Sequence, residues 1–142
     1  MELIYSDNSI AVCVKPAGVL STDEPGGAPE LLRSALGDPD AAVYTVHRLD
    51  RVVGGLLLLA RTREAASALG RQVMDGRFQK AYLAVVHGAP EQPEGTFTDL
   101  LRRDKRECRT YIAAAPGRDA REAISDYTLL ETADGLSPRL NH

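Results

Sequence analysis

The chain has 142 residues, of which 44% are hydrophobic and 26% charged, as in an ordinary soluble globular domain. Its longest apolar run, Leu56 to Ala60, is far too short for a membrane span, which needs about 20 residues, so we expect no membrane association. The net charge is only -3, but residues 47–110 hold twelve basic and eight acidic side chains. This uneven distribution is compatible with a nucleic-acid partner and equally with a solvated charged surface.

The N-terminal sequence MELIYSDNSI has no basic flank before an apolar run, so it does not resemble a secretory signal. The two cysteines, Cys13 and Cys108, share no metal-ligand spacing. A disulfide between them is one alternative, and free thiols in a reducing cytosol are the simpler one. We therefore expect a cytoplasmic protein. The sequence does not indicate an oligomeric state.

A strand and a helix are predicted in the first part of the chain. Ile10 to Val14 is apolar and rich in β-branched residues, which favours a strand, and Pro16 and Gly18 follow it as turn residues. Pro29 to Leu36 is predicted to form a short helix, because proline suits a first helical turn. Gly37 stands where a glycine cap commonly ends a helix.

Two further strands and a second helix are predicted next. The strands are Ala42 to Leu49 and Leu56 to Ala60, and the glycine pair at 54–55 between them allows a sharp or closely packed backbone. Thr62 is a good N-cap for a helix from Arg63 to about Asp75. Apolar residues at helical spacing give this helix one hydrophobic stripe.

Strands dominate the remaining prediction, at Lys80 to His87, Thr110 to Ala115 and Glu122 to Glu131. The charged segment from Leu101 to Arg109 is expected to be exposed, with a loop as one interpretation. Strands and helices do not alternate regularly, so a doubly wound parallel sheet is not expected. The sequence predicts one α+β domain over residues 1–142, with a mixed, largely antiparallel sheet and a few helices.

Asp50 is the residue whose setting points to chemistry. It lies between Arg48 and Arg51, where a strand is expected to end and a glycine-bearing turn to begin. Nearby cations keep a carboxylate ionised, and an ionised, positioned Asp acts as a nucleophile or general base. The structural alternative is an Asp that balances local charge or stabilises a turn.

The sequence around this residue resembles the signature motif of the RluA-type RNA pseudouridine synthases. The similarity comprises His47-Arg48-Leu49-Asp50, Gly55 and the run from Leu56 to Ala60. In that family the Asp of the motif is the catalytic nucleophile, a role that the resemblance assigns to Asp50. The chain departs from the family pattern at residues 52–54, where Val-Val-Gly replaces a frequent hydroxyl or acidic pair and Ser.

Two other segments resemble the same family in order and spacing. Val14 to Leu20 is similar to its Lys-Pro-x-Gly loop, and Lys80 to Gly88 to its lysine–tyrosine strand. The tyrosine of that strand lines the uracil pocket, so the resemblance makes Tyr82 a substrate-binding residue. Without the resemblance, Tyr82 reads as an aromatic residue at the edge of a core. The resemblance implies a pseudouridine synthase-like catalytic domain. Because Met1 lies only a strand's length before Lys15, we expect no S4-like domain ahead of it.

The family isomerises uridine within RNA by breaking the glycosidic bond, rotating the uracil and rejoining it through carbon. No cofactor and no metal is implied, and the RNA partner would be ribosomal or transfer RNA. The target nucleotide would be flipped into the pocket. The Asp attacks the nucleoside or takes a proton from the ribose, and both descriptions stay open. The expected phosphate contacts are Arg48, Arg51, Arg102, Arg103, Lys105 and Arg106.

A third family motif, Gly-Arg-Thr-His-Gln-Ile-Arg, supplies an Arg that pairs with the catalytic Asp, and it is not found in this sequence. We therefore expect a domain over residues 1–142 that is truncated at its C-terminus. Asp50 would then lack its distant Arg partner, unless Arg48 or Arg51 replaces it. Two alternatives to a working synthase follow. One is an inactive fragment with at most weak RNA binding, and the other is an unrelated α+β binding module in which the motif is coincidental.

Overall fold

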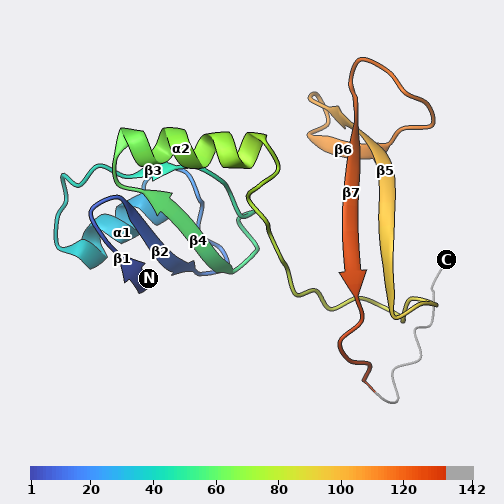
Figure 1. Ribbon diagram of the computed structural model, residues 1–142, viewed down its shortest axis with the longest axis horizontal. Helices are drawn as coiled ribbons and strands as arrows, with labels where there is room; N and C mark the ends of the chain where they lie inside the picture. Colours follow the sequence, from blue (N-terminus) through green and yellow to red (C-terminus); the bar gives the residue numbers. More distant parts are fainter. Residues whose placement is uncertain (134–142) are drawn as a thin grey trace. The chain divides into compact units, whose positions relative to one another are not determined.

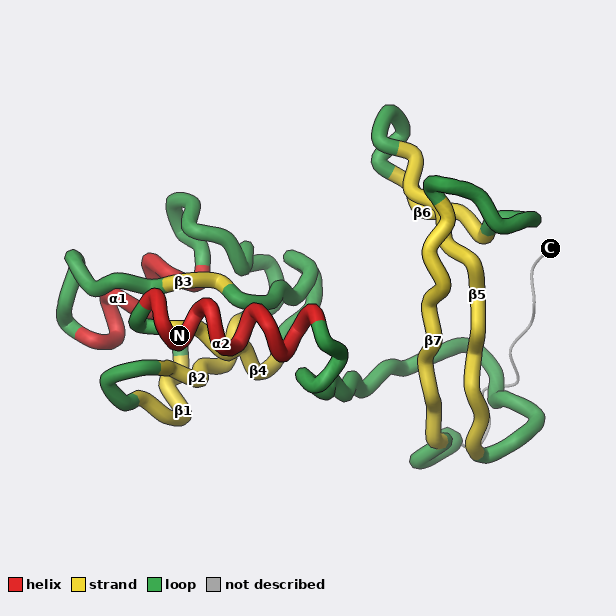
Figure 2. The backbone as a smooth tube through the Cα atoms, turned by 45° about the horizontal axis from the view of Figure 1, so that its top comes forward, coloured by secondary structure: helices red, strands yellow, loops and turns green. Residues whose placement is uncertain are grey.

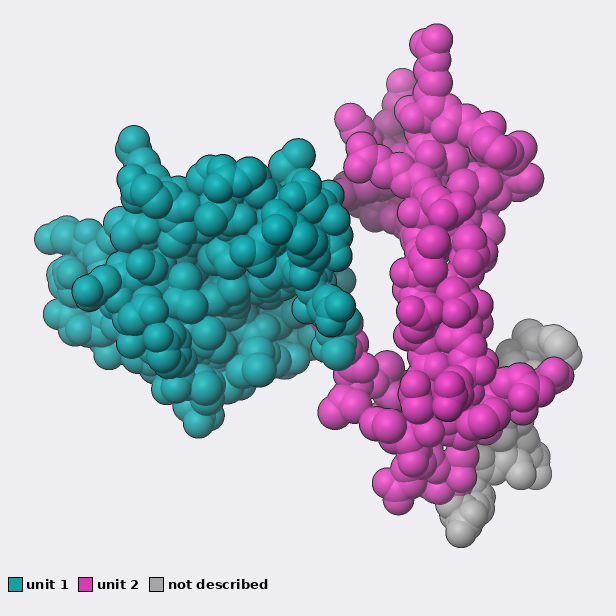
Figure 3. All heavy atoms as spheres, in the orientation of Figure 1, with its two compact units in different colours: residues 1–81 teal, residues 82–142 magenta. Residues whose placement is uncertain are grey.

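The computed structural model describes residues 1–133, which form two compact units of residues 1–81 and 82–133 (Figure 3). In the described residues, antiparallel sheets combine with the helices α1 and α2, which confirms the predicted α+β class. No described helix has both the length and the apolar character that a membrane crossing requires. The expectation of one catalytic domain over residues 1–142 stays a prediction.

The first unit contains a four-stranded antiparallel sheet in the order β1-β2-β4-β3 (Figure 1). The strands are β1 (Glu2–Ser6), β2 (Ile10–Lys15), β3 (Tyr44–Thr45) and β4 (Gly55–Ala60). The prediction for β2 and β4 is confirmed, whereas β1 was not predicted. A register shift in β1 between Leu3 and Tyr5 breaks the alternation of its side chains, which hides its strand pattern in the sequence.

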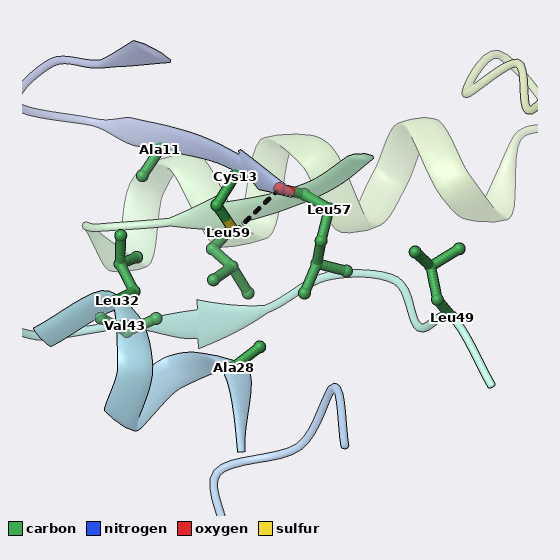
Figure 4. Packing of buried hydrophobic residues seen from close by; sticks show 8 residues of the cluster. All are labelled: Ala11, Cys13, Ala28, Leu32, Val43, Leu49, Leu57 and Leu59. Atoms are coloured by element: carbon green, nitrogen blue, oxygen red, sulfur yellow. Dashed lines mark hydrogen bonds between the residues drawn. The ribbon is translucent and has the colours of Figure 1, made fainter. Parts of the chain in front are cut away.

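One face of this sheet carries the hydrophobic core. Cys13 is paired with Leu57 and Ala11 with Leu59, so these four buried side chains lie on the same face. In Figure 4 they extend toward α1, and the Cys13 thiol donates to the Leu57 carbonyl at 3.6 Å. The other members of the core are Ala28, Leu32, Val43 and Leu49.

Both helices form as the sequence predicts. Helix α1 (Ala28–Leu36) ends at Gly37, which has a left-handed φ of 67° and donates to the carbonyls of the last turn. Helix α2 (Arg63–Met74) begins after Thr62, whose side chain accepts from the amide of Ala65. Helix α2 contacts β4 and β3. These helices are set by local signals, which explains why their limits were readable from the sequence.

The predicted strand from Ala42 to Leu49 is wrong in most of its length, because β3 has only two residues. Its pairing, Tyr44 with Ala60 and Thr45 with Leu59, stops where the chain turns away toward Asp50. The side chain of His47 accepts the next β4 amide, that of Leu58. A side chain has therefore replaced the backbone carbonyl that a longer strand would have supplied.

The second unit is a three-stranded antiparallel sheet in the order β6-β5-β7 (Figure 2). Its strands are β5 (Glu94–Asp104), β6 (Arg109–Ile112) and β7 (Ala120–Thr128). The last two lie within two or three residues of their predicted limits. Residues 101–104 are part of β5, so the charged segment that starts there is a strand end and a tight turn. None of residues 82–133 is buried.

The predicted strand from Lys80 to His87 is also wrong. These residues have no regular structure, and Leu83 and Val85 are 87% and 103% exposed. An alternating apolar sequence becomes a strand only where a neighbour satisfies its backbone groups. Within residues 1–133 no strand pairs with this segment.

Candidate nucleophile loop

The loop that carries Asp50 runs from residue 46 to residue 54, between β3 and β4. Its burial alternates, since His47 is half-buried and Leu49 buried, while Arg48 and Asp50 are exposed. The amide of Val53 donates to the carbonyl of Asp50 at 3.0 Å, which closes a turn. This bond involves only the backbone of Asp50, and the residue itself is exposed.

Ser21 fixes the residue before Asp50. Its hydroxyl donates to the Leu49 carbonyl at 2.8 Å and accepts from the Leu49 amide at 3.0 Å. Ser21 is only 3% exposed, so both bonds lie in the interior. The carbonyl of Ser21 in turn accepts from the Thr45 hydroxyl at 3.0 Å. The loop is thus attached to a segment that lies more than 20 residues earlier in the chain.

Lys15 and Gly18 fix the residue after Asp50. The Gly18 amide donates to the Arg51 carbonyl at 2.6 Å, and Arg51 Nε donates back to the Gly18 carbonyl at 3.0 Å. The fully buried Lys15 places its Nζ 2.6, 3.1 and 3.4 Å from the carbonyl oxygens of Val19, Pro16 and Arg51. Asp50 therefore lies between two residues whose backbones are both hydrogen-bonded to the 15–21 segment.

The glycine pair at the end of the loop allows this close approach. A Cβ on Gly54 would lie 3.4 Å from the Ala17 nitrogen and 3.5 Å from the Lys15 carbonyl oxygen. Gly55 has a φ of 145°, which disfavours any residue with a Cβ. The expectation of a closely packed backbone at residues 54–55 is confirmed.

The charge of Asp50 acts on the buried ammonium of Lys15. Burial lowers the pKa of Lys15, and the negative charge of Asp50 acts in the opposite direction. Within residues 1–133 neither Arg48 nor Arg51 forms an ion pair with Asp50. Besides the flanking arginines considered from the sequence, the fold therefore brings a buried lysine under the influence of the Asp50 charge.

His47 anchors the first half of the loop. Its Nε2 accepts from the Leu58 amide at 3.0 Å, and its ring lies 4.9 Å from the ring of Phe78. Burial lowers the pKa of His47, and the positive charge of Lys80 lowers it further. These effects favour the neutral imidazole, which is the form that accepts a hydrogen bond.

The other predicted site residues are exposed. Tyr82 is 58% exposed and is the first residue of the second unit. Its position relative to Asp50 stays a prediction, as do the substrate-binding roles of Arg48 and Arg51. The basic residues Arg102 and Arg103 lie at the end of β5, and Lys105 and Arg106 lie in the turn that follows it.

Comparison with known proteins decides the family. Residues 9–139 match the RNA pseudouridylate synthase family. The chain belongs to this family. The match confirms the resemblance to RluA-type synthases that rests on the motif around Asp50, and it excludes an unrelated binding module.

Individual relatives agree with this family assignment. Ribosomal large subunit pseudouridine synthase D of Xanthomonas campestris pv. campestris is 33% identical over 137 residues, covering 92% of this chain and 40% of that protein. The tRNA pseudouridine synthase C of Pectobacterium carotovorum subsp. carotovorum is 39% identical over 94 residues, covering 62% of this chain and 24% of that protein. The chain thus spans less than half the length of these two relatives.

Comparison with solved structures gives the same result for the fold. The human RNA Pseudouridylate Synthase Domain Containing 1 superposes with a TM-score of 0.76 at 23% identity, over 92% of this chain and 52% of that chain. The predicted pseudouridine synthase-like fold is therefore confirmed. The expectation concerning the third family motif involves residues from 134 onward, which lie outside the described residues.

Ser21 and Lys15 were not among the predicted site residues. Lys15 belongs to a segment that resembles the family's Lys-Pro-x-Gly loop, so a signal for it was present. For Ser21 there was none, because a serine in a Gly/Pro-rich loop is ordinary. Only the fold shows that its hydroxyl satisfies both backbone groups of Leu49.

Proposed function

We propose that this chain is an RNA pseudouridine synthase in which the carboxylate of Asp50 is the nucleophile. The observation that carries the proposal is an exposed carboxylate whose two neighbours in sequence are hydrogen-bonded to the 15–21 segment. Such a group is solvent-accessible yet held in place, which covalent catalysis requires. The RNA-directed names of the relatives give the substrate class.

In the proposed reaction, Asp50 acts at the ribose of a uridine within RNA by one of two routes. It attacks C1′ to form an ester that breaks when the new C1′–C5 bond forms, or it removes a ribose proton that it returns in that later step. The bond between C1′ and N1 breaks, the uracil turns, and a bond forms between C1′ and C5. The proton on C5 leaves and N1 gains one, so the product is an isomer of the substrate. No redox step and no co-reactant is involved.

The remaining predicted residues take binding roles in this proposal. Arg48 is exposed two residues before Asp50, and in the alternating loop both side chains lie on its outer side. A guanidinium there would contact the phosphates beside a flipped uridine. Arg51 has its Nε engaged with Gly18, which leaves its terminal nitrogens for a phosphate. Tyr82 would stack on the displaced uracil.

The proposal extends to ribosomal or transfer RNA as substrate, no metal or other cofactor, and a cytoplasmic location. Turnover is measured by tritium release from ribosomal and transfer RNA labelled at C5 of uridine. Release by the wild-type chain but not by Asp50→Asn is expected. Equal release by both proteins would remove Asp50 from the mechanism.

A second candidate function is RNA binding without isomerisation. The observation that favours it is the lack, within residues 1–133, of an ion pair between Asp50 and any basic side chain. Filter binding separates the two candidates. If wild-type and Asp50→Asn bind RNA equally and neither releases tritium, the binding function replaces the synthase function.

A further inference from the structure

The hydrogen-bond pattern of β4 shows where β3 would continue. Tyr44 is paired with Ala60 and Thr45 with Leu59, so the same register would next pair Val46 with Leu58. In an antiparallel ladder the amide of Leu58 would then have a backbone carbonyl as acceptor. Instead, it donates to His47 Nε2 at 3.0 Å. The strand ends at this point.

The hydrogen bond also fixes the tautomer of the ring. Because Nε2 accepts, the proton of the neutral imidazole is on Nδ1. Nδ1 is buried and has no hydrogen-bond partner within residues 1–133. The ring therefore satisfies the N–H of Leu58 while leaving its own buried N–H unsatisfied. Because one buried nitrogen stays without a partner, a gain in hydrogen bonds does not explain why the ring lies here. A buried unsatisfied group needs another structural explanation.

That explanation is the direction of the chain. With the ring as acceptor, the backbone at residues 46–47 no longer has to follow β4. The chain leaves the sheet, Leu49 turns inward to Ser21, and Asp50 comes to the surface two residues later. Phe78 packs on the imidazole at 4.9 Å between ring centres. Burial and the nearby charge of Lys80 both lower the pKa of His47, which favours the neutral ring.

We propose that His47 is a positioning residue, whose Nε2 takes the place of a backbone carbonyl opposite Leu58 and thereby directs the 48–50 segment outward. The proposal rests on the proposed function in one respect, namely that Asp50 is the group being positioned. The hydrogen bond itself and the order of the loop are independent of any activity.

Three substitutions separate this role from simple packing. The Oε1 of His47→Gln lies the same number of bonds from Cβ as Nε2, so it retains an acceptor at the same reach. His47→Asn has the same amide one bond shorter, and His47→Leu fills the site without any acceptor. The Gln and Asn variants form a matched pair, because they differ only in reach.

Each variant of the full chain is examined by NMR for exchange of the Leu58 amide and for the order of the 48–50 amides, and by tritium release for kcat and KM. We expect His47→Asn and His47→Leu to lose about tenfold or more of Leu58 amide protection. We also expect kcat to fall about ten- to a hundredfold while KM stays within about threefold, as for a misplaced reactive group. His47→Gln should restore both quantities to near the wild-type values.

The proposal is overturned if the Gln and Asn variants behave alike, or if His47→Leu retains both Leu58 protection and kcat. Should the wild-type chain form no pseudouridine, the proposed function fails by itself. The amide measurements then still decide the role of His47: a loss of order at residues 48–50 in the Asn and Leu variants, reversed in the Gln variant, supports it. Unchanged order in all three variants contradicts it.

Discussion

The hydroxyl of Ser21 and the backbone of Leu49 are joined by two hydrogen bonds, one in each direction, at 2.8 and 3.0 Å. Leu49 is the residue immediately before Asp50. The reactive carboxylate that we propose is therefore positioned by a residue 28 positions earlier in the sequence. A surface loop with such an internal attachment has less freedom than its irregular backbone indicates.

Ser21→Ala should destabilise the first unit by about 2 kcal/mol, because it leaves the Leu49 amide and carbonyl without their partner. Urea unfolding followed by exchange of the β2 and β4 amides measures this change. Ser67→Ala, on the exposed side of α2, is the control and should cost less than about 0.5 kcal/mol. Equal stability of the two variants would show that the Ser21 hydroxyl does not hold the loop.

Lys15→Met should be more damaging, since it removes an ammonium that lies near three carbonyl oxygens and is fully buried. Unsatisfied buried acceptors cost about 1–3 kcal/mol each, so we expect a loss of at least about 2 kcal/mol in the free energy of unfolding. The same exchange experiment measures it, with the exposed Lys105→Met as control. A stable Lys15→Met protein would mean that these carbonyls do not depend on the lysine.

The bond between His47 and Leu58 should weaken in acid. The folded-state pKa of His47 is lowered by burial and by Lys80, so the unfolded chain binds more protons as the pH falls below about 6.5. Stability from the neutral ring is thus present at higher pH and lost as the pH falls toward the folded-state pKa. Exchange of the Leu58 amide as a function of pH, compared with His47→Gln, tests this. Identical pH profiles would argue against protonation of His47.

The second unit offers a separate test at Gly95. A Cβ on Gly95 would lie 2.7 Å from the ring of Tyr127, which stacks on Phe97 with 4.8 Å between ring centres. Gly95→Ala should displace the ring and cost about 1 kcal/mol, the usual contribution of an aromatic pair. In a Tyr127→Ala background the same substitution should be nearly neutral. An equal cost in both backgrounds would place the effect in the backbone.

The parts of the fold that were readable from the sequence depend on neighbouring residues. Thr62 caps α2 and Gly37 ends α1 through bonds made within one turn of the helix. The limits of β3 depend on a side chain accepting from a distant amide, and the pairing of residues 80–87 depends on a neighbour strand. The hydrophobic pattern of a segment does not show whether such a distant partner is present.

The candidate site likewise has one part that the sequence shows and another that only the fold shows. The motif around Asp50 is contiguous, so its place in a turn that leads into β4 followed from the sequence, although the strand before it ends earlier, at Thr45. Lys15 and Ser21 reach the loop through bonds across 36 and 28 residues. No spacing rule connects such pairs before the fold is known, and for this reason the flanking arginines were considered instead of the buried lysine.

The central claim is that the Asp50 carboxylate performs the isomerisation, and single-turnover tritium release from uridine-labelled RNA tests it most directly. Wild-type is compared with Asp50→Asn and with Asp40→Asn, an exposed acidic control of the same unit, at equal RNA occupancy measured by filter binding. We predict that Asp40→Asn matches the wild-type and that Asp50→Asn loses at least about a thousandfold in rate with unchanged RNA affinity. Tritium release by Asp50→Asn at the rate of the control would contradict the account.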